Sequence, residues 1–162
     1  MSGLSIGMSY QGGIIGYIYQ PGDPGYDPLV QHGIIASQND ISANIIWYNE
    51  DSIYTNANGI GIADGIANTN TIIKVQGHGQ YAASICKRAV IQGYNDWCLP
   101  SIGELNKLYI SRNLIGGFKV DHYWSSTDST FVYAKLHWFG DKLDQGDEYK
   151  CVPYRVRPIR YF

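Results

Sequence analysis

The pattern of apolar and polar positions in the first half of the chain predicts strands and loops. Two Ile-rich runs, "GGIIGYIYQ" from Gly12 and "HGIIAS" from His32, flank the turn-rich stretch "PGDPGYDP". Apolar runs bounded by Gly and Pro are typical of strands, so we expect a hairpin with a long loop. After "IIWYNE" the chain is rich in Gly, Asn and Ala through Asn70 and shows no period, which predicts irregular surface structure.

A helical period follows this stretch. Apolar residues at Ala82, Ile85, Cys86, Ala89 and Val90 share one helix face and predict a helix from about Gln80 to Ile91. The segment "LPSIGELNKLYISR" opens with a capping box, in which Ser101 is the N-cap and Glu104 stands three residues later. It predicts a second helix.

From Tyr123 the pattern returns to strands, with "YWSS", "FVYAKLHWF" and "YRVRPIR" separated by a hairpin turn in Gly140–Gly146. The order of elements predicts an α+β fold in which two helices pack on short antiparallel sheets with long loops. In the middle strand one face carries Val132, Ala134, Leu136 and Trp138, which we interpret as core. The opposite face carries Phe131, Tyr133, Lys135, His137 and Phe139.

The opposite face mixes aromatic rings with a Lys and a His, spaced roughly 6.8 Å apart along a strand. Flat rings add contact area with few rotors to freeze, and sugar rings stack on them, so this face is a candidate ligand surface. The alternative is that another element or a neighbouring subunit covers it.

Composition predicts one globular domain over residues 1–162, because hydrophobic residues make up 44% and charged residues 16%. A net charge of −2 argues against a nucleic-acid binder. No apolar run approaches the roughly 18 residues that span a bilayer, so we expect no membrane insertion. The start, "MSGLSIGMSYQGG", shows no secretory signal. The 14 Tyr and 19 Gly indicate a loop-rich protein built for contact.

The sequence carries no enzyme motif. Four scattered His residues lack zinc-site spacing, and no Gly-x-Ser-x-Gly elbow or phosphate loop is present, so we expect no catalysis. We interpret Cys86, Cys98 and Cys151 as buried small residues, and a Cys86–Cys98 bridge stays open.

We also expect no cofactor. "DKLDQGDE" from Asp141 offers oxygen ligands that Ca²⁺ could use but matches no calcium motif, so a solvated hairpin tip is the favoured interpretation. Asp23 and Asp27 are interpreted as turn caps.

Further residues are given structural roles. Arg155, Arg157 and Arg160 are expected to pair across the sheet rather than to bind anions. Five apolar residues are assigned to the core, namely Trp97, Leu99, Pro100, Tyr123 and Trp124.

Several pieces of the sequence occur together and in order: "GGIIGYI", "PGDPGYD", "HGIIAS", "YAASIC", "GYNDWCLPSIGELNKLY", "GGF", "YWSST" and "YRVRPIRYF". On these pieces the chain resembles, nearly end to end, the C-terminal domain family of the Legionella collagen-like adhesin. Relatives occur in bacterial surface proteins and phage tail fibres. The resemblance implies a C-type-lectin-like fold, related to the sulfatase-modifying-factor domain, that acts as a binding tip, often on homotrimeric stalks.

The adhesin of this family recognises sulfated glycosaminoglycans, and some relatives are variable proteins of diversity-generating retroelements. Here acidic residues outnumber Lys after "YWSST", which argues against a sulfated ligand. AAC codons mutated at adenine can give Phe131, Tyr133 and His137 but not Lys135, so the window fits diversification only in part.

Together these observations predict a non-enzymatic recognition domain on a virion tail or cell surface that binds a cell-surface polysaccharide. The resemblance alone implies that it is a homotrimer. The alternatives are a variable protein or adhesin that binds a host surface protein, and a structural fibre component. The predicted ligand-binding residues are Asp128, Ser129, Phe131, Tyr133, Lys135, His137, Phe139, Asp141, Lys142 and Gln145.

Overall fold

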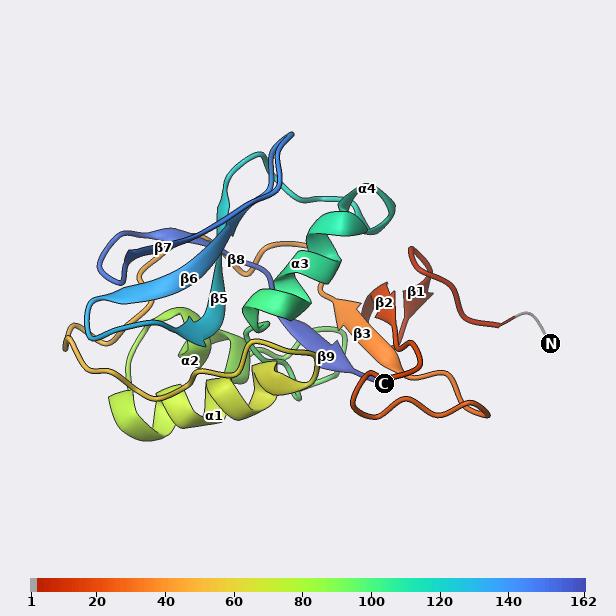
Figure 1. Cartoon of the computed structure of the whole chain (residues 1–162), viewed down its shortest axis with the longest axis horizontal. Coiled ribbons are helices and arrows are strands. Elements are labelled where there is room, and N and C mark those ends of the chain that lie inside the picture. The colour runs from red at the N-terminus through yellow and green to blue at the C-terminus, as the bar shows by residue number, and fades with distance from the viewer. Residues whose placement is uncertain (1–2) are drawn as a thin grey trace.

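The computed structural model describes residues 3–162 and shows an α+β arrangement of two small sheets and short helices (Figure 1). The predicted α+β class is confirmed. The smaller sheet has the order β1-β2-β3-β9 and the larger one the order β4-β8-β5-β6-β7. The N-terminal end of the described chain and the C-terminus both lie beside the smaller sheet, away from β6 and β7 (Figure 1).

The predicted hairpin forms the centre of the four-stranded sheet. Its strands are β2 (Gly13–Ile18) and β3 (Gly33–Ala36), with β1 (Ser9–Tyr10) and β9 (Ile159–Tyr161) at the edges. In its long loop, Asp23 Oδ2 accepts a hydrogen bond from the Gln20 amide at 2.8 Å, and Asp27 Oδ1 accepts one from the Leu29 amide at 2.7 Å. The predicted turn-capping roles of both Asp residues are confirmed.

The five-stranded sheet contains β4 (Ser42–Ile45), β5 (His122–Asp128), β6 (Tyr133–Trp138), β7 (Asp144–Tyr149) and β8 (Tyr154–Val156). Two predictions are wrong here. The hairpin turn predicted in Gly140–Gly146 does form, but the strand that follows it is not "YRVRPIR": it is β7, which begins at Asp144, an acidic edge strand that hydrophobicity does not reveal. The strands are also not all antiparallel, because β8 pairs with β5 in parallel.

In the described residues, four helices lie between β4 and β5 in the chain: α1 (Asp64–Gln76), α2 (Ala82–Lys87), α3 (Ile102–Ile110) and α4 (Arg112–Ile115). The predicted capping box of α3 is confirmed, since Ser101 Oγ accepts from the Glu104 amide and Glu104 Oε2 accepts from the Ser101 amide. Helix α2 ends at Lys87, earlier than predicted.

Helix α1 begins inside the stretch that was predicted to be irregular through Asn70. Its polar side chains bond to neighbouring loops instead of to water. Asn68 Nδ2 donates to the Gly59 carbonyl at 2.7 Å, and Thr69 Oγ1 accepts from the Leu99 amide at 3.0 Å. Tertiary contacts therefore outweigh the low helix propensity of this segment.

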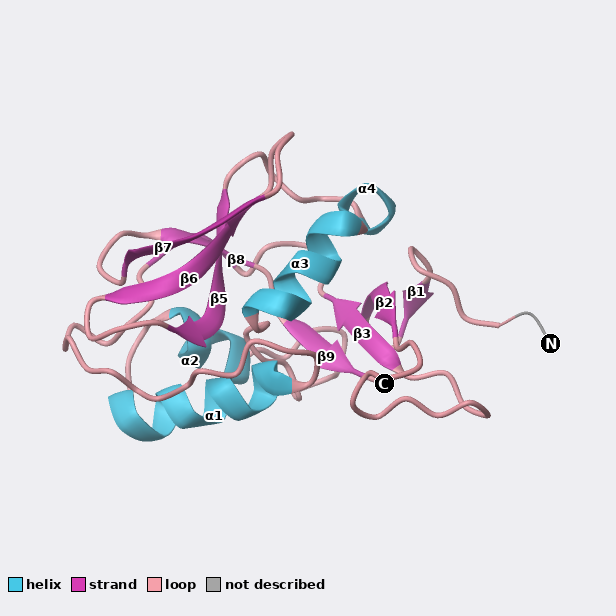
Figure 2. Ribbon diagram, viewed as in Figure 1, coloured by secondary structure: helices cyan, strands magenta, loops and turns pink. Residues whose placement is uncertain are grey.

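Helices cover both faces of the five-stranded sheet. Helices α1 and α2 pack on the face that carries Trp124, Ala134 and Leu136. Helix α3 packs on the opposite face, against Tyr123 and Phe139, and runs between the two sheets (Figure 2). The five residues assigned to the core are all buried, as predicted.

Two cysteines, Cys86 and Cys98, are buried and free, whereas Cys151 is free and exposed. The expected burial is thus wrong for Cys151, and no Cys86–Cys98 bridge forms. Burial raises the pKa of both buried thiols. Among residues 3–162, no helix combines the length and the apolar character needed to cross a bilayer.

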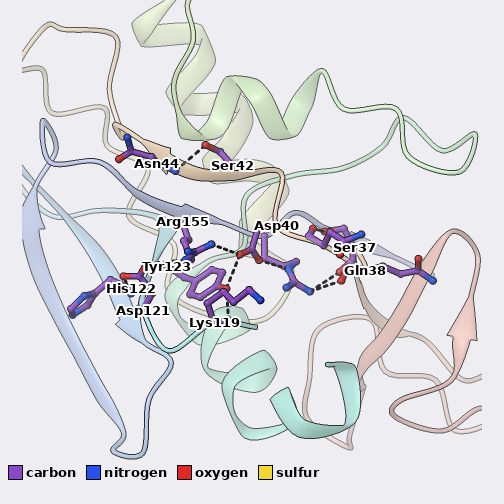
Figure 3. Close-up of polar contacts among 12 residues, drawn as sticks. Ser37, Gln38, Asp40, Ser42, Asn44, Lys119, Asp121, His122, Tyr123 and Arg155 are labelled. Atoms are coloured by element: carbon purple, nitrogen blue, oxygen red, sulfur yellow. Dashed lines mark hydrogen bonds and ion pairs between the residues drawn. The ribbon is translucent and has the colours of Figure 1, made fainter. Parts of the chain in front are cut away.

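The three arginines near the C-terminus pair with aspartates, as predicted. Arg157 Nε lies 2.7 Å from Asp40 Oδ1, and Arg160 Nε lies 2.6 Å from Asp96 Oδ1. Arg155 bridges Asp40 and Asp121, and the Tyr123 hydroxyl donates to Asp40 at 2.9 Å (Figure 3). The network around Asp40 lies where the two sheets meet, whereas the separate Arg160–Asp96 pair ties β9 to the loop before α3.

Candidate functional site

A groove of about 530 Å³ lies between α3 and the β6–β7 hairpin, on the face that the sequence marked as a candidate surface. We call it the β6–β7 groove. It is lined by Ile60, Ile102, Gly103, Asn106, Lys135, Gln145, Gly146 and Asp147.

Strand register builds the floor of the groove. Lys135 lies opposite Asp147, and His137 lies opposite Gln145. Because alternate residues share a face, Lys135 and His137 stand on the same side of β6 as Tyr133. The floor therefore combines residues of β6 with their partners on β7.

The first turn of α3 builds the wall. The Gly103 amide donates to the Ile60 carbonyl at 3.0 Å, which holds the exposed Ile60 beside the helix. A side chain at position 103 would collide with that carbonyl, so glycine permits this close approach. Asn106, one turn further along α3, completes the wall.

Two tyrosines continue the same face beyond the groove. Tyr133 lies opposite Tyr149, and their ring centroids are 4.6 Å apart. A second ring pair, Tyr54 and Phe131, has centroids 6.3 Å apart, and Phe131 is 65% exposed. This end of the sheet therefore presents aromatic surface to solvent.

Charges in the groove neutralise each other. Lys135 Nζ lies 2.9 Å from Asp147 Oδ1, and Ser129 Oγ donates to Asp147 Oδ2 at 3.0 Å. Because Lys135 is paired, the described residues that line the groove offer no free cation to an anionic ligand. Among residues 3–162, no three His, Cys, Asp or Glu side chains come together as a metal-binding group.

The structure removes three of the predicted residues from the candidate surface. Helix α3 covers the part of the face at the C-terminal end of β6. There His137 is fully buried and Phe139 is 3% exposed. Phe139 stacks on Phe118 at a centroid distance of 4.5 Å. Asp128 is 3% exposed and lies 2.8 Å from the buried Lys150 Nζ. The expectation that they face solvent is wrong.

The other predicted residues stay accessible but do not form one cluster. Lys135 and Gln145 line the groove, and Tyr133 and Ser129 lie next to it. Asp141 and Lys142 occupy the exposed turn between β6 and β7, at the opposite end of β6 from Tyr133 and Phe131. On the predicted core face, Val132 and Trp138 are less buried than Ala134 and Leu136.

Sequence reasoning missed the other residues that line the groove and two tyrosines beside it, namely Ile60, Ile102, Gly103, Asn106, Gly146, Asp147, Tyr54 and Tyr149. Asp147 and Tyr149 follow from Gln145 by alternation, so a correct hairpin register identifies them. Nothing local marks Ile60 or Asn106, because tertiary packing alone brings them to the sheet.

The fold and the groove define an α+β domain with a polar surface site. No family model matches the sequence, and no curated protein does. The fold is similar to that of a fimbrial protein from Bacteroides ovatus ATCC 8483, with a TM-score of 0.60 and 14% identity over 91% of this chain and 43% of that one. At this identity the likeness concerns the fold alone, and this chain spans less than half of that protein's length.

Proposed function

We propose that this chain is a non-enzymatic recognition domain with a C-type-lectin-like fold, which binds a cell-surface glycan through the β6–β7 groove and the adjoining tyrosines. The observation that carries the proposal is the placement of Lys135, Asp147, Gln145 and Asn106 in one groove beside Tyr133. Convergent polar groups next to flat rings suit a polyhydroxylated ring, which offers both hydroxyls and an apolar face.

The proposed setting is the tip of a bacterial surface appendage or a phage tail fibre. The resemblance in sequence to binding tips and the likeness in fold to a fimbrial protein both support a surface location. Single sugar contacts are weak, so the proposal includes several copies per particle, with a homotrimer as the expected assembly.

A glycan array tests the proposal, with capsule fragments and sulfated glycosaminoglycans among the probes. Tyr133→Ser removes one stacking surface, and we expect it to weaken binding about tenfold, which corresponds to roughly 1.4 kcal/mol. The melting temperature should change little because Tyr133 is only half-buried. Tyr26→Ser is the matched control, since Tyr26 is 39% exposed in the distant β2–β3 loop.

Other results would redirect the proposal. Equal binding by wild type and Tyr133→Ser would move the site elsewhere, and binding to no glycan would overturn the glycan assignment. Loss of cell binding after protease treatment of the target cells would identify a host protein as the receptor. Loss of oligomer in Phe131→Ser, measured by light scattering, would make the exposed ring a subunit contact in a fibre.

A further inference from the structure

The buried His137 fixes the orientation of a residue in the β6–β7 groove. Its Nδ1 lies 2.8 Å from the Trp138 carbonyl oxygen, and its Nε2 lies 3.2 Å from Asn106 Oδ1. A carbonyl oxygen can only accept, so Nδ1 must carry the proton that it donates to Trp138. In a neutral ring, Nε2 then holds a lone pair and needs a donor.

This requirement decides which way the Asn106 amide points. Amide oxygen and nitrogen are assigned from the hydrogen-bond network, and two acceptors cannot face each other. With neutral His137, Asn106 Nδ2 therefore donates to Nε2, and the amide oxygen takes the opposite position. The Asn106 amide atom on the side away from His137 bonds to no residue in the described range 3–162, and Asn106 lines the groove. The groove then receives a carbonyl oxygen.

The surroundings of His137 favour the neutral ring. Its exposed fraction is zero, and Tyr109 of α3 packs on it at a centroid distance of 4.5 Å. Burial lowers the pKa of His137, and the positive charge of Arg112 lowers it further, whereas the Trp138 carbonyl and Asp144 on β7 raise it. The other neighbours are Phe139 and two cross-strand residues, Gln145 on β7 and Tyr123 on β5. None of them carries a charge, since burial raises the pKa of Tyr123.

We propose that Asn106 is a specificity-determining residue of the groove, held by His137 so that its amide oxygen accepts a hydrogen bond from a ligand hydroxyl. This inference rests on the proposed glycan-binding function and narrows it. Because Lys135 is paired with Asp147 and Asn106 presents an acceptor, the groove selects neutral, hydroxyl-rich sugars over carboxylated or sulfated ones.

Acid reverses this preference. When His137 gains a proton, its Nε2–H can donate to Asn106 Oδ1. The Asn106 amide is then turned so that Oδ1 lies next to the His137 ring. The amide NH₂ then faces the groove and offers donors to an anionic sugar. Binding of neutral sugars should therefore weaken below the pKa of His137.

The first experiment needs no ligand. Long-range ¹H–¹⁵N NMR at pH 7.5 should show His137 protonated at Nδ1 and bare at Nε2. Asn106→Asp places a carboxylate beside Nε2, so the pKa of His137 should rise above the wild-type value. Asn113→Asp is the control, because Asn113 is exposed on α4. A proton on Nε2 at pH 7.5, or an unchanged pKa in Asn106→Asp, would overturn the inference.

The second experiment measures binding of neutral hexose oligosaccharides and uronic-acid oligosaccharides at pH 7.5 and pH 5. Asn106→Leu removes the acceptor and should weaken binding of the neutral set on the order of tenfold, whereas Asn106→Asp keeps an outward acceptor and should retain it. Circular dichroism checks that both variants fold. If sugars bind but Asn106→Leu equals wild type, the inference alone fails. If wild type binds no oligosaccharide of either set, the proposed function itself fails.

Discussion

Glu104 shows how strongly one buried carboxyl can be constrained at the scale of a single residue. Its side chain is fully buried at the start of α3, and it accepts hydrogen bonds from the Ser101 amide, the Ala63 amide and the Tyr161 hydroxyl, each at 2.8 Å. Burial raises its pKa to about 7 and outweighs these three bonds, which lower it. The folded protein therefore holds the Glu104 proton more tightly than the unfolded chain does.

This difference predicts a pH dependence of stability. Stabilisation from Glu104 is fully present below its unfolded pKa of 4.5 and is lost as the pH rises through about 7. The variant Glu104→Gln has no titrating group at this position and serves as the reference. Relative to it, the free energy of unfolding of the wild type should fall on the order of 3 kcal/mol between pH 4 and pH 8, because one pKa unit is about 1.36 kcal/mol. Urea unfolding at each pH measures the difference. A constant difference across this range would contradict the raised pKa.

At the scale of elements, the Lys150–Asp128 pair fastens the loops around the exposed rings. The Lys150 ammonium lies 2.8 Å from Asp128 Oδ1, and it donates to the Ile53 carbonyl at 2.9 Å and the Thr130 carbonyl at 2.7 Å. Asp128 Oδ2 in turn accepts from the Thr55 amide and hydroxyl. The pair thus joins the end of β5, the β5–β6 loop and the residue after β7 to the loop before α1.

Lys150→Met should be strongly destabilising, because it leaves the Asp128 carboxylate buried without its counter-ion. Breaking such a pair costs about 3–5 kcal/mol, measured by urea unfolding. The variant should also bind glycans more weakly, since Tyr54 and Phe131 lie on the loops that it releases.

Two further variants sharpen this prediction. Lys142→Met is the control, because Lys142 is exposed in the β6–β7 turn. The double variant Asp128→Asn/Lys150→Met removes the unpaired charge while keeping an acceptor for Thr55, so it should recover part of the lost stability. If the double variant is less stable than Lys150→Met, the cost of burying an unpaired carboxylate is not the cause.

Elements with local signals could be predicted from the sequence, and elements held by distant contacts could not. The capping box from Ser101 to Glu104 is local and identified α3, and Gly and Pro punctuation identified the β2–β3 hairpin. Helix α1 was missed because its polar residues reach across to Gly59 and Leu99. Alternation in β6 correctly grouped Tyr133 with Lys135, but it could not show that α3 covers His137.

At the scale of the whole molecule, two chain segments belong to both sheets. Residues 33–45 supply β3 to the four-stranded sheet and β4 to the five-stranded sheet. Residues 154–161 supply β8 to the five-stranded sheet and β9 to the four-stranded sheet. The segments run antiparallel, and Asp40 meets the fully buried Arg157 at the crossing between the sheets. Neither sheet can therefore unfold without disturbing the other, and the crossing depends on this pair.

Asp40→Asn tests the crossing, because it withdraws the only carboxylate within ion-pair distance of Arg157 in residues 3–162 and leaves a buried guanidinium charge. The expected loss is about 3–5 kcal/mol, a large share of the 5–15 kcal/mol that stabilises a typical domain. Asp51→Asn, at an exposed position, should cost little. Urea unfolding followed by tryptophan fluorescence and by far-ultraviolet circular dichroism should give coincident transitions at lower urea. Two separate transitions would show that the sheets unfold independently. That result would contradict the prediction, because the shared segments require both sheets to unfold together.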